Sequence, residues 1–130
     1  MEEKGLEDGA WVAPIVLENM KTDSKAYEEE LFGPIFNLFK VKDAGEAYKL
    51  ANKTDYGLAA TVFTQDKKQA IEAAEAIRAG TVFVNDMVAS GSEFPGGGIK
   101  SSGYGRECYT DGLLDTGNRK TVIMNKQWKN

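Results

Sequence analysis

The acidic run Glu28-Glu29-Glu30 is the first place where this sequence could do chemistry. Leu31-Phe32-Gly33-Pro34 follows directly, so an apolar aromatic segment and a rigid turn lie next to the carboxylates. A carboxylate beside an aromatic wall is suited to binding the hydroxyl groups of a sugar next to a planar ring. The alternative is an ordinary solvated acidic face, because acidic side chains are mostly exposed. From the residues alone, both interpretations stay open.

Cys108 is the only thiol, and the chain contains no His. A nucleophilic Cys needs a partner base or cationic surroundings that lower its pKa, and only Arg106 is close in sequence. We therefore favour a small packed side chain over a nucleophile at this position. One Cys and no His also exclude an internal disulfide and a Cys-cluster or His-ligated metal site within the chain, so no metal is expected.

Eight of the fourteen glycines lie within residues 91–117, which invites a phosphate-binding interpretation. The details argue against it. A Walker A loop requires Gly before the Lys-Ser pair, but Lys100-Ser101 follows Ile99. Gly103-Tyr104-Gly105 begins a dinucleotide fingerprint, yet Cys108 stands where its third glycine belongs. Tight structural loops are the favoured interpretation of this region.

The elements that would position these residues alternate between two patterns of apolar spacing. Short β-prone runs predict strands over residues 11–17, 35–41, 57–63, 81–84 and 120–124. Helix-forming residues predict helices over residues 23–30, from the capping pair Asp43 and Glu46 onward, and over 66–79, where Ala70, Ala74 and Ile77 form a stripe. This alternation favours an α/β fold with some parallel strand pairing. No linker divides the chain.

Composition limits the class of protein. The chain has 130 residues, 42% hydrophobic and 28% charged, which is typical of one soluble globular domain. Its net charge of −4 offers no basic excess, so neither nucleic acid nor an anionic membrane is an expected partner. The acidic start differs from a signal or transit peptide, and no apolar run approaches the length of a membrane span. A cytoplasmic location is expected.

Five groups of motifs resemble the C-terminal portion of the aldehyde dehydrogenase superfamily, in the family's order and at similar spacings. They are EELFGP at residues 29–34, LAN with DYGLAA at 50–60, AGTVFVN at 79–85, PGGGIKSSGYGRE at 95–107 and KTV at 120–122. The resemblance implies an NAD(P)-dependent enzyme that oxidises an aldehyde to an acid through a cysteine thiohemiacetal and thioester. The fold it implies is the C-terminal part of the catalytic domain, a mixed sheet with flanking helices, plus an oligomerisation strand.

The resemblance also assigns residues. By position in the motif, Glu30 would hydrogen-bond the ribose hydroxyls at the nicotinamide end of NAD or NADP, and Phe32 would pack against that ribose or ring. Glu107 would lie near the water channel of the active site in a supporting role. Gly96 stands where the family often has a Phe that walls the substrate tunnel, so the substrate aldehyde stays undefined.

Other family motifs are absent. The segment that carries the nucleophilic Cys, the segment that carries the general-base Glu and the Rossmann-like cofactor domain do not occur here. Cys108 follows the GRE motif, which is a different place, and so does not inherit the nucleophile's role. We expect a fragment without catalytic residues of its own that is inactive alone and binds no cofactor tightly.

The expected organisation is residues 1–117 as catalytic-domain portion and residues 118–130 as oligomerisation strand and tail. The expected partners are a second copy of the chain or full-length aldehyde dehydrogenase subunits, with a small aldehyde as substrate of the intact enzyme. The alternative is a non-catalytic interaction or assembly module related to these enzymes.

Overall fold

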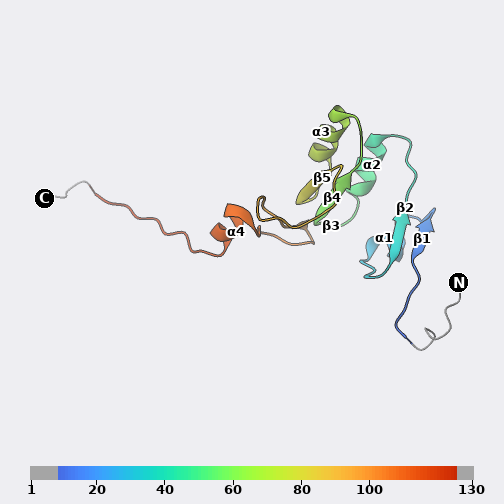
Figure 1. Cartoon of the computed structure of the whole chain (residues 1–130), viewed down its shortest axis with the longest axis horizontal. Coiled ribbons are helices and arrows are strands. Elements are labelled where there is room, and N and C mark those ends of the chain that lie inside the picture. The colour runs from blue at the N-terminus through green and yellow to red at the C-terminus, as the bar shows by residue number, and fades with distance from the viewer. Residues whose placement is uncertain (1–8, 126–130) are drawn as a thin grey trace. The chain divides into compact units, whose positions relative to one another are not determined.

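The structure is a computed structural model that describes residues 9–125. The chain forms two compact units, one within residues 1–54 and the other within residues 55–130 (Figure 1). No Pro- or Gly-rich stretch marks this boundary, and for that reason the sequence did not predict it. Each unit is described by itself.

The first unit is a βαβ arrangement followed by a second helix. Its elements are β1 (Ile15–Glu18), α1 (Lys25–Glu28), β2 (Ile35–Leu38) and α2 (Ala44–Ala51). The two strands pair in parallel, from Ile15 opposite Ile35 to Glu18 opposite Leu38. Each strand is shorter than predicted, and Pro14 lies just before β1, where its missing N–H removes no ladder bond.

A pair of side chains that resembles a capping box starts α2, as the sequence predicts. The Asp43 side chain accepts a hydrogen bond from the backbone N–H of Glu46 at 2.8 Å. The Glu46 carboxylate accepts in return from the backbone N–H of Lys42 at 2.9 Å. The first bond satisfies an N–H group that has no partner within the helix, and the second holds the residue just before the cap.

Tyr27 connects α1 to α2. Its hydroxyl donates to the carbonyl oxygen of Leu50 at 2.9 Å, and its ring meets Phe39 edge-on at 5.5 Å. Burial raises the pKa of the Tyr27 hydroxyl. Because α1 is a single turn, which is marginal as an isolated helix, these tertiary contacts help to hold it.

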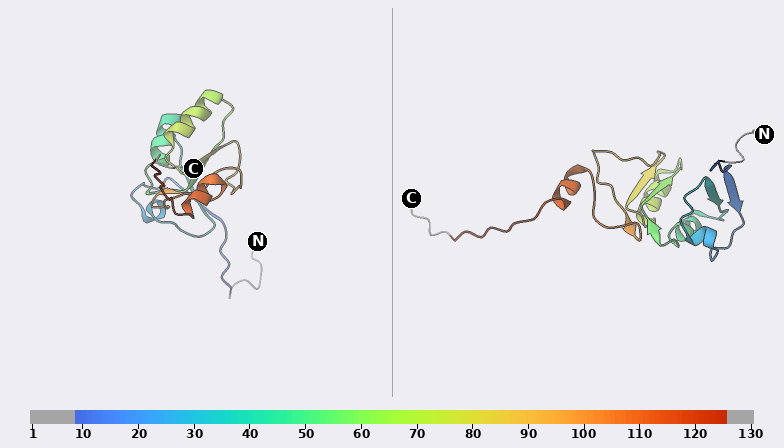
Figure 2. Two further views of the ribbon diagram at one scale, coloured as in Figure 1. Left: turned by 90° about the vertical axis from the view of Figure 1, so that its left-hand side faces the viewer. Right: turned by 90° about the horizontal axis from the view of Figure 1, so that it is seen from below.

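The second unit contains six short elements within its described residues, 55–125. They are β3 (Tyr56–Gly57), β4 (Ala59–Val62), α3 (Lys67–Ala76), β5 (Thr81–Val84), β6 (Ile99–Lys100) and α4 (Tyr109–Asp115). β4 and β5 pair in parallel, whereas β3 and β6 pair antiparallel. Parallel and antiparallel pairs with flanking helices confirm the α/β class (Figure 2).

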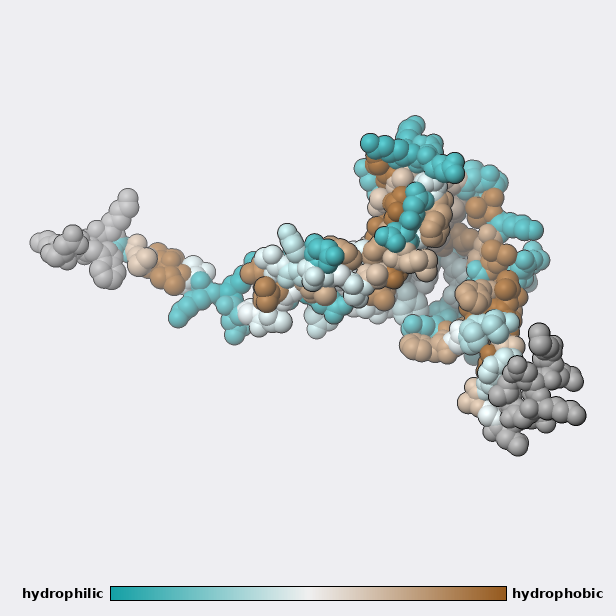
Figure 3. All heavy atoms as spheres, in the orientation of Figure 1, coloured by the Kyte–Doolittle hydropathy of each residue, from teal (hydrophilic) through white to brown (hydrophobic). Residues whose placement is uncertain are grey.

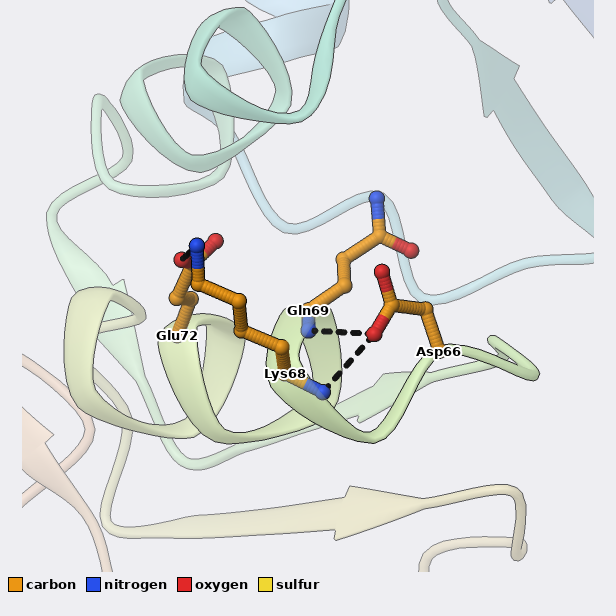
Figure 4. Close-up of polar contacts among 4 residues, drawn as sticks. All are labelled: Asp66, Lys68, Gln69 and Glu72. Carbon is orange, nitrogen blue, oxygen red and sulfur yellow. Dashed lines mark hydrogen bonds and ion pairs between the residues drawn. The ribbon is translucent and has the colours of Figure 1, made fainter.

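α3 is the best-defined helix of this unit. The Asp66 side chain caps it by accepting hydrogen bonds from the backbone N–H groups of Lys68 at 2.8 Å and Gln69 at 3.4 Å (Figure 4). Ala73 is fully buried, and no other hydrophobic side chain within residues 9–125 is. The predicted stripe was therefore wrong in one member, because Ala74 is exposed and its neighbour Ala73 occupies the inner face.

Three elements differ from the sequence prediction. The strand expected over residues 57–63 is interrupted at Leu58, which separates β3 from β4. α4 lies in the glycine-rich region, where the sequence predicted mostly loop. Residues 120–124 form no strand within the described part of the chain, so the expected oligomerisation strand is not confirmed. A strand exists only when another strand supplies ladder partners, and none lies beside this segment (Figure 2).

Large hydrophobic side chains are exposed in both units (Figure 3). Val16 is 59% exposed and Phe36 is 61% exposed, although both belong to the parallel pair of the first unit. Parallel strands are normally covered on both faces. In the second unit, Val122, Ile123 and Met124 are 66%, 91% and 71% exposed.

Candidate functional site

The turn between α1 and β2 positions Glu30 and Phe32. Glu29 ends the helix, and its backbone N–H donates to the carbonyl oxygen of Lys25 at 2.9 Å. Phe32 has a left-handed backbone with φ of +43°, which is costly for a bulky residue. The turn is closed behind it, because Ile35 N–H donates to the Gly33 carbonyl at 2.8 Å. Pro34 is tied to β1 by a 2.9 Å bond from Ile15 N–H.

This strained turn presents an aromatic ring to solvent. Phe32 is 91% exposed, and Glu30 two residues earlier is also exposed. Within the described residues, the Glu30 carboxylate makes no hydrogen bond or ion pair and the Phe32 ring makes no aromatic contact. The two side chains are therefore available to accept hydrogen bonds from a ligand's hydroxyl groups and to pack against its ring.

A pocket of about 220 Å³ lies in the second unit. Phe83 on β5 and Phe94 form an aromatic wall, with ring centroids 5.9 Å apart at 77°. The other lining residues are Leu58, Ala59, Thr81, Val88, Ala89, Ser90, Gly91, Gly96, Gly97, Glu107 and Cys108. The pocket is thus mostly apolar, with one carboxylate and one thiol on its lining, which is typical of a site for a small organic molecule.

Glu107 is held at this pocket by its backbone. Its N–H donates to the Gly96 carbonyl at 2.8 Å, and its carbonyl accepts from Gly96 N–H at 2.9 Å. This bridge joins the start of the glycine-rich loop to the segment before α4. The same residue also lines a more open groove of about 640 Å³ on the second unit.

Arg106 uses its guanidinium to hold the loop. Nη1 donates to the carbonyl oxygens of Gly98 at 3.1 Å and Gly105 at 2.6 Å. Its backbone N–H donates to the Asp115 carboxylate at 2.7 Å. Arg106 is the cationic side chain nearest in sequence to Cys108. Its guanidinium is engaged with main-chain oxygens.

Cys108 is half-buried, lines the pocket and precedes α4 with φ of +62°. Its neighbours in the lining are mostly apolar. These surroundings suit the packed side chain that the sequence favours over a nucleophile. Within residues 9–125, no group of His, Cys, Asp or Glu side chains is arranged to hold a metal ion. The helices of the same range are all too short or too polar to cross a bilayer.

Sequence reasoning found the turn but missed most of the pocket. Phe83, Val88 and Phe94 were not singled out, although Thr81 and Phe83 alternate on β5 and so share one face. The alternation of Thr81 and Phe83 is the sequence signal that could have identified this face of the pocket. Glu30 and Phe32 belong to the first unit, whereas the pocket with Glu107 and Cys108 belongs to the second.

Comparison with known proteins shows one family. A model of the aldehyde dehydrogenase family matches residues 1–122. The chain is 43% identical over 114 residues to succinate-semialdehyde dehydrogenase [NADP(+)] of Deinococcus radiodurans, covering 88% of this chain and 24% of that protein. It is 41% identical over 122 residues to cytosolic aldehyde dehydrogenase 1 of Elephantulus edwardii, covering 94% of this chain and 24% of that protein.

A solved structure gives the same result for the fold. A point mutant of betaine aldehyde dehydrogenase from Staphylococcus aureus, in complex with NAD+, superposes with a TM-score of 0.89 at 34% identity. The match covers 100% of this chain and 26% of that one. The chain thus spans about a quarter of the length of these relatives.

Proposed function

The chain belongs to the aldehyde dehydrogenase family, and from that membership we propose that it supplies the C-terminal part of the catalytic portion of an NAD(P)-dependent enzyme that oxidises an aldehyde to a carboxylic acid. In that enzyme its first unit meets the nicotinamide end of the cofactor, and the pocket of its second unit contributes to the substrate side. We expect the chain by itself to be inactive, because its sequence lacks the segments that carry the family's nucleophilic Cys and general-base Glu.

The exposed ring of Phe32 on a strained turn beside Glu30 carries this proposal. A left-handed backbone and an exposed aromatic ring both cost free energy, and strain of this kind gathers at ligand-binding positions. The Staphylococcus aureus structure, whose match covers 100% of this chain, is a complex with NAD+. The Deinococcus radiodurans relative carries NADP(+) in its name. These observations support a nicotinamide cofactor and leave the choice between NAD and NADP open.

The described residues fit one end of such a cofactor. The Glu30 carboxylate can accept hydrogen bonds from two ribose hydroxyls, and the Phe32 ring can pack against the sugar or the nicotinamide. When bound, the nicotinamide supplies the oxidant of the reaction. The part of this chain is to bind and orient that group, while Glu107, which lines the pocket, has a supporting role.

The first experiment measures turnover of the 130-residue chain with short aliphatic, aromatic and semialdehyde substrates and with each cofactor. We expect no NAD(P)H formation above the buffer rate. Turnover that survives repurification and disappears in Cys108→Ala would show that the thiol is a nucleophile and would contradict the proposal.

The second experiment places residues 9–125 in the Staphylococcus aureus enzyme in exchange for the segment they match. In this chimera, Glu30→Gln should weaken NAD+ binding about tenfold or more, since hydrogen bonds to a charged group contribute about 1.5–3 kcal/mol. Glu29→Gln is the matched control, because it removes an adjacent exposed carboxylate from the same turn. If Glu30→Gln and Glu29→Gln bind NAD+ with equal affinity, Glu30 is excluded as a cofactor ligand.

The exposed C-terminal segment favours a second candidate function, assembly. Val122, Ile123 and Met124 form a β-prone run that is mostly exposed and unpaired in the described structure. Such a run is a template for strand pairing with another chain. The partner in this candidate is a second copy or a full-length aldehyde dehydrogenase subunit, and the chain then acts without catalysis.

A further inference from the structure

Asn85 lies directly after β5 and has an unusual backbone. Its φ of +54° is left-handed, a conformation that Asn adopts more readily than other non-glycine residues. Its N–H donates to the carbonyl oxygen of Val62 at 2.8 Å, which continues the pairing of β4 and β5 beyond the last strand residue. The chain therefore turns away from the sheet at this residue.

The Asn85 side chain pairs with the backbone of Thr64. Oδ1 accepts from Thr64 N–H at 2.8 Å, and Nδ2 donates to the Thr64 carbonyl at 2.8 Å. One backbone partner is a donor and the other is an acceptor, so together they determine which end of the Asn85 amide is oxygen. This pairing needs an acceptor and a donor on one short planar group. An ionised Asp carries acceptors but no donor, so it cannot form both bonds.

The residues after Asn85 form part of the pocket wall. Residues 88–91 line the pocket, as does Phe83 two positions before Asn85. Burial does little to hold this stretch, because Met87 is 71% exposed and Val88 is 53% exposed. Among the described residues, no hydrogen bond ties residues 86–91 to another helix or strand. The last attachment before this wall is Asn85.

We propose that Asn85 is a positioning residue whose paired amide sets the course of residues 86–91 and so holds one wall of the pocket. The proposal rests on the proposed function in that it names what shapes the substrate side of the enzyme. Its test reads the geometry of the pocket and requires neither cofactor nor turnover, so the two proposals can fail separately.

Cys108 serves as the reporter, because it lines the same pocket and is the only thiol of the chain. The experiment measures its alkylation rate with two uncharged reagents, iodoacetamide and the bulkier N-phenylmaleimide, in the full chain. The variants are Asn85→Asp, which removes the donor, and Asn85→Gly, which removes both bonds and keeps the left-handed backbone accessible.

Both variants should increase the maleimide rate about fivefold, the factor that corresponds to roughly 1 kcal/mol of lost restraint. The iodoacetamide rate should rise less, because a small reagent already enters. Asn19→Asp is the matched control. Asn19 also has a left-handed backbone, φ +56°, but its side chain makes none of the described hydrogen bonds and it lies in the first unit. This control should leave both rates unchanged.

Two results would overturn the proposal. Rates equal to those of the unsubstituted chain in both Asn85 variants would show that the amide does not hold the wall. Rates equal to those of the urea-unfolded chain with both reagents, together with loss of the far-UV circular dichroism signal, would show that Asn85 serves general stability and no local positioning.

Discussion

Gly80 and Gly97 approach so closely that a Cβ atom on Gly80 would lie 1.7 Å from the carbonyl oxygen of Gly97. Gly80 immediately precedes β5, and its N–H donates to the Gly57 carbonyl at 3.0 Å. Gly57 is also confined, though less tightly, since a Cβ there would lie 2.9 Å from the Arg78 carbonyl oxygen. The second unit is therefore packed backbone against backbone at its centre, and main-chain atoms cannot swing aside as side chains do.

Gly80→Ala should destabilise the second unit by at least about 3 kcal/mol, because the added methyl group meets a carbonyl oxygen. Urea unfolding followed by circular dichroism measures this change. Gly117→Ala is the control, since a Cβ there would make an ordinary 3.8 Å contact with the Leu113 carbonyl. It should alter the free energy of unfolding by less than about 0.5 kcal/mol. Similar values for the two variants would contradict the close approach.

Asp66→Ala should reduce the stability of α3 by about 1 kcal/mol, because it leaves the N–H groups of Lys68 and Gln69 without their side-chain acceptor. Asp66→Asn keeps an acceptor of the same shape and should cost only a few tenths of that amount. The difference between the urea unfolding midpoints of Asp66→Ala and Asp66→Asn measures the contribution of the capping hydrogen bonds. If Asn destabilises as much as Ala, charge and not the hydrogen bonds stabilises this helix end.

Tyr27→Phe should cost about 0.5–1.5 kcal/mol, because it removes the hydrogen bond to the Leu50 carbonyl and keeps the edge-on ring contact with Phe39. Tyr109→Phe is the comparison, since Tyr109 is 53% exposed. The free energy of unfolding at pH 7 provides the measurement. A loss in the Tyr109 variant as large as in the Tyr27 variant would exclude the α1–α2 connection as the cause.

The same residue gives a pH dependence. Burial raises the pKa of Tyr27 in the folded chain above the value of about 10 of an unfolded Tyr, so the folded state holds this proton more tightly. Its contribution to stability is fully present below pH 10 and is lost as the pH rises through the folded pKa. Between pH 8 and 11, the free energy of unfolding should therefore fall more steeply with pH for the unsubstituted chain than for Tyr27→Phe. Parallel curves would contradict this.

The isolated chain should self-associate. Exposed hydrophobic side chains occur in both units, and the net charge of −4 opposes association only weakly at physiological salt. Light scattering over a concentration series should give a mass above 14.2 kDa. Val122→Pro should shift the population toward monomer by removing a ladder donor, whereas Val122→Thr keeps the donor and the branched shape. A monodisperse monomer at high concentration would exclude association.

Local signals in the sequence predicted several elements and one part of the site. Asp43 with Glu46 marked the start of one helix, and the structure confirms that cap. The helix expected from residue 66 onward is also present, and the structure adds that Asp66 caps it. The EELFGP motif drew attention to Glu30 and Phe32, and the structure places both on an exposed turn. These predictions succeeded because caps and turns depend on residues three or four positions apart.

The length of each strand and the pocket could not be predicted in that way. The run over residues 57–63 looked continuous, but Gly57 pairs with Ile99 in one sheet while Ala59 pairs with Thr81 in another. The run over residues 120–124 has strand propensity but no partner within the described chain. Strand formation depends on a second segment that sequence-local patterns do not identify.

By itself, the sequence determined the family, the α/β class and the starts of the two main helices, since each rests on short local patterns and on their order along the chain. Tertiary structure alone decided that Gly80 meets Gly97, that Asn85 pairs with Thr64, and that Phe83, Phe94 and Cys108 share one pocket. These contacts join positions 11 to 25 residues apart. Such separations are set by how strands pair and helices pack, and the spacing of residue types does not encode them.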